Sequence, residues 1–222
     1  MAQETKTTIC NKALLLIGEE PINSYDDDTS LAGRVCRLHF DSVFRSVLES
    51  GHWTDVTTVE MLLPISVQQK EALDNTEQEK MDSEGIYGPK KRYYAIPADC
   101  ATIIDVYPAG RERFRQNPVV WNIRYLRELG NKFIETSYPM PLNIEYIKEV
   151  ANMDLYSSKF ADCLYTALAA AICMPLTKDM QKTQAIVQYA AQIKADALRE
   201  NLNEDGEDKQ IYVPASIMAR GR

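Results

Sequence analysis

Apolar residues recur at helical spacing in two runs within the first fifty positions of the chain. The first run consists of Ile9, Ala13, Leu16 and Ile17. The second run consists of Cys36, Phe40, Val43, Phe44 and Val47. Spacings of three and four residues place each run on one face of a helix, so the pattern predicts two amphipathic helices that face a common core.

The segment between these two runs contains signals that end one helix and begin the next. Gly18 stands where a helix end favours a residue that tolerates positive φ, and Pro21 cannot continue a helix. Asp26, Asp27 and Asp28 precede the second run, where carboxylates cap free N–H groups. A metal site is the alternative, but three consecutive carboxylates point apart, whereas a hard cation needs converging oxygens. We therefore expect the aspartates to act as caps.

After Trp53 the pattern changes to the short, β-branched and aromatic segments that are typical of strands. Gly and Pro residues separate them, so we predict a small antiparallel sheet. The expected strands are 56–63, 93–97, 102–107, 119–125, 132–136 and 142–147. Residues 66–92 are polar and contain few large apolar groups, so a long loop or insertion is expected there.

The last third of the chain returns to helical periodicity. One apolar stripe consists of Phe160, Cys163, Leu164, Ala167, Leu168, Ala171 and Ile172. We expect Pro175 to interrupt this helix and Thr177 or Asp179 to open the next one. The second stripe consists of Ile186, Val187, Ala190, Ile193, Ala197 and Leu198.

These elements predict an α+β fold. We expect a mainly helical bundle of about four helices, with a small antiparallel β insertion and an extended C-terminal tail. The predicted organisation is an N-terminal helical pair at 1–53, a β insertion at 54–150 that holds the long loop 66–92, a C-terminal helical pair at 151–200, and a tail at 201–222 that begins as an acidic linker.

Composition narrows the class of protein. The chain has 222 residues with ordinary apolar and charged fractions, which excludes disorder of the whole chain. No apolar run approaches the roughly 20 residues of a membrane span, and the first residues lack the apolar region of a secretory signal. A formal charge of −7 argues against binding nucleic acid by neutralising phosphates. Five widely spaced cysteines favour reduced, buried thiols.

Candidate catalytic and metal-binding residues are few. His39 lies near an apolar helical face, and Ser50, His52 and Asp55 are too close in sequence to converge as a catalytic triad. The stretch from Asn201 to Gly206 imitates the start of a calcium loop, but its twelfth position is Tyr212 instead of a glutamate. No zinc or phosphate-binding motif occurs. We therefore predict no catalytic, cofactor-binding or metal-binding residues.

Several short motifs occur in an order that is typical of one family of viral assembly proteins. They are Ala13 to Ile22 (ALLLIGEEPI), Gly51 to Trp53 (GHW), Tyr94 to Cys100 (YAIPADC), Ile144 to Ile147 (IEYI), Ala169 to Ala171 followed by Met174 to Thr177 (MPLT), and the closing Ala219-Arg220. With these motifs, which run nearly end to end, the chain resembles the tail tubular protein A family, the head-to-tail adaptors of short-tailed bacteriophages. The long stretch 66–92 and the acidic linker 203–208 depart from the family pattern.

The resemblance implies a structural virion protein and no enzyme. Such a protein would form a homo-oligomeric ring of twelve subunits at the head-tail junction, after assembly in the host cytoplasm. Its partners would be the portal protein and a tail nozzle similar to tail tubular protein B. DNA would pass through the ring during ejection without sequence-specific binding. The resemblance implies no cofactor and no contact with a membrane.

Two regions are the expected contact sites in such an assembly. Apolar and basic residues of the terminal segment would dock on the portal or on a neighbouring subunit, as segments do that fold on binding. These residues are Ile211, Tyr212, Val213, Pro214, Ile217, Met218 and Arg220. The alternative is that this tail folds back on its own subunit. A basic cluster of Arg111, Arg113 and Arg115 forms possible loop contacts with DNA or with an acidic neighbour.

Two other functions remain open from the sequence. Tail components also include hydrolases that act on host surface polysaccharide, and this is the alternative function. A cellular helical scaffold or signalling adaptor has the same helical periodicity.

Overall fold

The computed structural model describes residues 4–65, 91–110, 119–127, 130–138 and 141–204. Its contacts divide the chain into two units: the first combines Met1–Thr57 with the chain from Ile147 onward, and the second is Thr58–Tyr146. The described residues contain four α-helices and two small antiparallel sheets, so the fold is α+β. Helix accounts for 48% and strand for 24% of the structure, so the expected predominance of helix is only partly matched.

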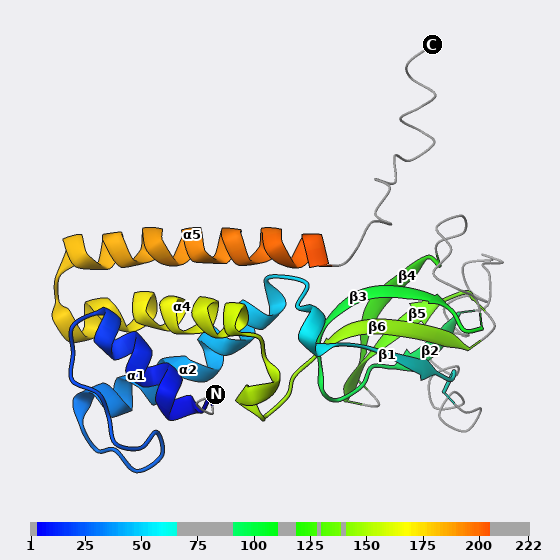
Figure 1. The fold of residues 1–222 in the computed structure, drawn as a ribbon. Helices are drawn as coiled ribbons and strands as arrows, with labels where there is room; N and C mark the ends of the chain where they lie inside the picture. Colours follow the sequence, from blue (N-terminus) through cyan, green and yellow to red (C-terminus); the bar gives the residue numbers. More distant parts are fainter. Residues whose placement is uncertain (1–3, 66–90, 111–118, 128–129, 139–140, 205–222) are drawn as a thin grey trace. The chain divides into compact units, whose positions relative to one another are not determined.

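The first unit is helical. Its helices are α1 (Lys6–Leu16), α2 (Leu31–Glu49), α4 (Ser158–Thr177) and α5 (Met180–Glu204), with short 3-10 helices η1 (Thr54–Val56) and η2 (Met153–Leu155). Helix α4 contacts each of the other three helices, and Figure 1 shows it between α5 and the pair α1 and α2. Helices from the two ends of the chain therefore share one core.

Aromatic side chains around Phe160 form the centre of this core. The ring of Phe160 is stacked on Tyr156 at 4.4 Å and meets Trp53 and Phe44 edge to face at 4.9 and 5.9 Å. The indole of Trp53 is fully buried, and its N–H donates to the backbone carbonyl of Val47 at 3.0 Å. These contacts fasten the end of α2 to the start of α4.

Polar side chains fix the connection between α1 and α2. The Asn11 side chain donates to the carbonyl of Ile22 at 2.9 Å and accepts from its N–H at 2.8 Å. The guanidinium of Arg37 donates to the carbonyls of Tyr25 and Asp28 at 2.6 and 2.7 Å. The loop is therefore held by side chains from both helices that it joins.

The expected caps of α2 need correction. Its N-cap is Ser30, whose hydroxyl accepts from the N–H of Gly33 at 3.0 Å. The Asp28 carboxylate does not cap the helix; it accepts from the backbone N–H of the cap residue Ser30 at 2.8 Å. Asp27 accepts from the Ser24 hydroxyl at 3.3 Å. The aspartates thus shape the preceding turn, while a serine closes the helix.

The expectations for the last two helices also need correction. Pro175 does not interrupt α4, which continues to Thr177 and ends at Lys178 in the left-handed region (φ 55°). A proline lacks the backbone N–H that would bond within the helix, and α4 ends two residues later. Helix α5 extends to Glu204, beyond the expected end near 200. Val187 of the predicted stripe is 48% exposed.

The second unit is built from strands β1 (Thr57–Leu62), β2 (Arg92–Ala95), β3 (Cys100–Pro108), β4 (Trp121–Leu126), β5 (Asn131–Thr136) and β6 (Leu142–Lys148). They form two sheets, with strand orders β1-β6-β3 and β2-β5-β4, where a single sheet was expected. Inward-facing residues of both sheets share one core, which contains Leu62, Tyr94, Val106, Ile134, Leu142, Ile144 and Tyr146.

A partly buried acid on β5 bonds to a residue of β4 and to the residue before β2. The Glu135 side chain is 11% exposed and accepts from Arg124 of β4 at 2.6 Å and from Lys91 at 2.9 Å. Burial of the carboxylate alone would raise its pKa, but the hydrogen bonds and charges of Lys91 and Arg124 outweigh this effect and hold the pKa of Glu135 below its ordinary value.

Helix α4 contradicts the expectation that no segment is long enough to span a membrane. Among the described residues, Ser158–Thr177 is long and apolar enough by length and composition alone. Half of its most apolar window is buried inside the protein. Core helices of water-soluble proteins also pass this test, so the finding is weak evidence for a span.

We predict that Phe160→Ala lowers the free energy of unfolding of the helical unit by about 3–5 kcal/mol, because it leaves a cavity among the three aromatic rings of Phe44, Trp53 and Tyr156. Trp53 and Trp121 are the only tryptophans of the chain. In a Trp121→Phe background, Trp53 is the sole tryptophan, so its fluorescence during urea unfolding measures the free energy of unfolding of the helical unit.

The matched control for this substitution is Leu38→Ala, since Leu38 lies on α2 and is 76% exposed. It should change the free energy of unfolding by less than about 0.5 kcal/mol. If Phe160→Ala lowered the free energy of unfolding by less than about 1 kcal/mol, this result would contradict the packing described above.

We further predict that Glu135→Gln destabilises the strand unit by about 1–3 kcal/mol at neutral pH, because two cations lose their charged partner. Because the folded pKa is lowered, the contribution of Glu135 is complete above the unfolded pKa and disappears as pH falls through the folded value. The difference between wild type and variant should therefore narrow as the pH falls below the ordinary pKa of a glutamate. Native-state hydrogen exchange of the β2 and β5 amides measures this difference in stability. The control is Lys132→Gln, because the Lys132 side chain is exposed.

Candidate interface site

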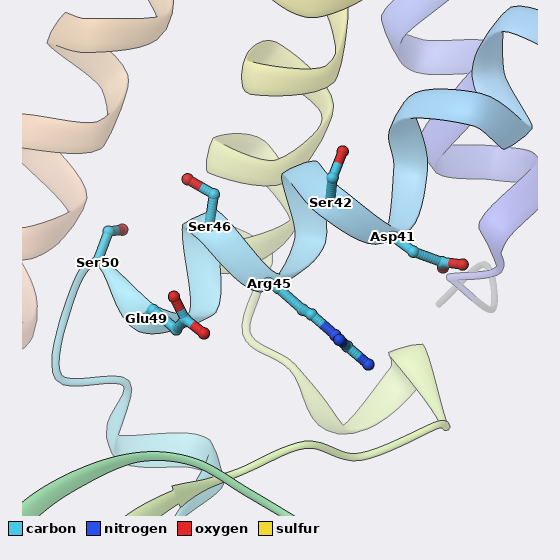
Figure 2. A pocket seen from close by; sticks show the side chains of 6 residues that line it. All are labelled: Asp41, Ser42, Arg45, Ser46, Glu49 and Ser50. Atoms are coloured by element: carbon cyan, nitrogen blue, oxygen red, sulfur yellow. The ribbon is translucent and has the colours of Figure 1, made fainter.

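Two parallel rows of polar side chains run along the solvent face of α2 (Figure 2). One row is Asp41, Arg45 and Glu49, and the other is Ser42, Ser46 and Ser50. Both rows have a spacing of four residues, so their members lie one above another on the helix. Together they line an open hollow of about 640 Å³ among the described residues.

The charged row has only weak partners. Asp41 lies 3.4 Å from the Lys6 ammonium, and Arg45 lies 3.9 Å from the Glu149 carboxylate. All four side chains are more than 40% exposed. Exposed pairs of this kind contribute at most about 1 kcal/mol each, so the row can exchange its partners for those of another protein at little cost.

An apolar groove lies beside the serine row. Its volume is about 320 Å³ and its walls belong to three helices of the same unit. Helix α2 contributes Ser42, Val43, Ser46 and Val47; helix α4 contributes Cys163, Ala167 and Ala170; helix α5 contributes Val187, Ala190, Ala191 and Lys194. The small side chains of α4 leave the space open between α2 and α5.

Cys163 lies in the floor of this groove and is almost fully buried. Its thiol lies 3.8 Å from the carbonyl of Ile193 on α5. Burial, together with the nearby Asp162 carboxylate, raises the pKa of Cys163 to about 11. The thiol is therefore protonated at neutral pH and behaves as an apolar lining group.

The geometry of these two surfaces suits contact rather than chemistry. The six polar side chains of the hollow come from one helix and stand side by side, whereas a catalytic or metal site needs groups that converge. The Ser50 hydroxyl donates to the carbonyl of Val47 at 2.7 Å, and Asp55 is exposed in η1. In the described part of the chain, no three His, Cys, Asp or Glu side chains gather as a metal site.

The residues that were predicted to make contacts lie outside the described ranges. This applies to Arg111, Arg113 and Arg115, and to the terminal set Ile211, Tyr212, Val213, Pro214, Ile217, Met218 and Arg220. The structure therefore does not test them.

Sequence reasoning missed both surfaces on α2. The available signal was the repeat of serine at 42, 46 and 50, next to alanines at 167, 170, 190 and 191. Such small residues fit equally well in a tightly packed helix pair, so the repeat alone does not indicate a groove.

Comparison with known proteins adds no relative. The chain matches no model of a known protein family, and no curated protein sequence gives a significant match.

We predict that the thiols of the folded protein react slowly. All five cysteines are free, and all except the half-buried Cys100 are buried. Burial and the neighbouring Asp99 raise the pKa of Cys100 to about 11 as well, so only about one thousandth of it is thiolate at pH 8. An aromatic disulfide reagent should therefore modify at most one thiol of the folded protein at pH 8, and that one slowly, whereas it should modify all five in urea.

The variant Cys100→Ser serves as the control, because it should remove the only thiol that reacts in the folded state. Rapid modification of two or more thiols in the native protein would contradict the burial described for the helical cysteines.

Proposed function

We propose that the chain is a structural virion protein that acts as a head-to-tail adaptor. In this proposal its subunits form a ring of twelve copies between the portal and a tail nozzle. The ring forms part of the channel through which DNA leaves the capsid.

The observation that carries this proposal is the ordered set of motifs in the sequence. The set begins with the helix end at Gly18 and Pro21, continues through Gly51 to Trp53 and Tyr94 to Cys100, and closes with Ala219-Arg220. It spans the helical and the strand segments alike, in the order that the adaptor family shows. The proposal therefore rests on motifs distributed along the chain and not on one binding or catalytic site.

The arrangement of the chain supports the same role. We infer that α1, α2, α4 and α5 form a four-helix body, with the strand unit as an insertion between the helical pairs. Such a body can pack against its copies, while the insertion and the tail present loops to other proteins. The expected contacts of Arg111, Arg113 and Arg115 and of residues 211–220 belong to this part of the proposal.

The charge and the α2 surface are compatible with a ring around DNA. A chain with a formal charge of −7 binds the DNA backbone weakly, which allows DNA to slide through a channel. Helix α2 presents Asp41, Arg45 and Glu49 together with a row of serines, so oppositely charged groups can pair across a lateral contact between copies.

The proposal predicts that the purified chain forms a ring only when portal particles are present. Full-length protein would be mixed with portal particles from the same phage and examined by sedimentation and negative-stain electron microscopy. The expected result is co-sedimentation and a ring on one end of the portal. Removal of residues 207–222 should abolish attachment, because the apolar anchors are lost.

Circular dichroism of the truncated chain provides the control, since its helical content should remain that of the intact protein. No co-sedimentation and no ring with the intact chain would refute the adaptor function. Full attachment by the truncated chain would refute only the docking role of the tail, and turnover of host polysaccharide would favour the hydrolase.

A further inference from the structure

The groove between α2, α4 and α5 is an unfilled apolar surface in the middle of the helical unit. Its volume of about 320 Å³ is roughly twice that of an engineered cavity that binds benzene, so it has room for about two large side chains. Val187 on one wall is 48% exposed, although it belongs to the apolar stripe of α5. An apolar occupant would remove this surface from water.

We propose that in the free subunit this groove binds the apolar residues 211–213 of the chain's own C-terminal segment. This inference concerns the unassembled chain and does not depend on the adaptor function. The segment Ile211-Tyr212-Val213 has the β-branched and aromatic side chains that a narrow apolar groove accommodates. Pro214 follows, and a proline favours extended geometry for the residue before it.

Distances along the chain fit this occupant. Helix α5 ends at Glu204, and at 1.5 Å per residue the groove residue Lys194 lies about 15 Å before that end. The six residues 205–210 span up to about 20 Å when extended, so Ile211 can return to the level of Lys194. The groove continues to Val187 over about 10 Å of helix, the length of three extended residues.

The polar groups around the groove suit an extended backbone that follows an acidic linker. The Ser42 and Ser46 hydroxyls and the Lys194 ammonium line the groove beside its apolar residues and are able to hydrogen-bond peptide groups. The linker carries Asp205, Glu207 and Asp208, which the positive charge of Lys194 attracts. A tether of this length also gives the segment a millimolar effective concentration, about the value for short linkers, which favours its own groove over that of another copy.

Hydrogen exchange of the full-length chain tests the inference, with mass spectrometry of peptides that cover 205–222. In the wild type, the amides of 211–213 should exchange at least about tenfold more slowly than those of an unstructured peptide. Ala191→Trp places an indole in the groove from an exposed position and should return them to the unstructured rate. Ala185→Trp, on the same helix but outside the groove lining, should change nothing.

A second variant tests the occupant itself. Ile211→Asp should abolish the protection while leaving the helical circular dichroism unchanged, because α5 ends at Glu204, seven residues earlier in the chain. Exchange at the unstructured rate in the wild type, or equal effects of the two tryptophans, would overturn the proposal. Protection that grows with protein concentration, together with a dimer mass by light scattering, would instead assign the groove to a second copy and overturn it as well.

Discussion

The packing around Phe160 is the interaction on which the helical unit depends. Its ring contacts Phe44 on α2, Trp53 after α2 and Tyr156 directly after η2. The first two contacts join segments more than a hundred residues apart. Bringing together segments that are far apart in sequence costs chain entropy. Burial of large aromatic groups is the strongest favourable term available to offset this cost. Because the strand unit is inserted between Trp53 and Tyr156, the same contact brings together the chain on both sides of the insertion.

Side chains from distant positions complete the backbone hydrogen bonds that helix ends leave free. Asn11 pairs with both backbone groups of Ile22, and Lys182 on α5 donates to the carbonyl of Ile17 at the end of α1. Gly18 follows with a φ of 74°, as a helix end of this type requires. Buried carbonyls that lack a partner are costly, so these contacts stabilise the end of α1 and the loop that follows it.

Local signals in the sequence predicted the type of each element well, because periodicity depends on which face of an element is buried. The six strands and four helices follow the predicted order, and Gly18 adopts the expected positive φ. The division of the strands into two sheets was not predictable, since pairing depends on contacts such as Tyr94 opposite Ile134 that lie far apart in sequence. The groove was missed for the same reason: Ala167 and Ala191 each look like ordinary helical packing residues.

The length of α5 explains how a groove can persist in a well-packed unit. Lys182 holds one end of the helix to α1, and at the other end Leu198 packs so closely on Gly51 that a Cβ there would lie 2.0 Å from its Cδ2 atom. Between these two points α5 exposes Val187 and Tyr189 and crosses the alanines of α4 without filling the space beside them. A helix fixed at both ends keeps its middle at a set distance from α2, so the groove is maintained by attachments that any occupant leaves intact.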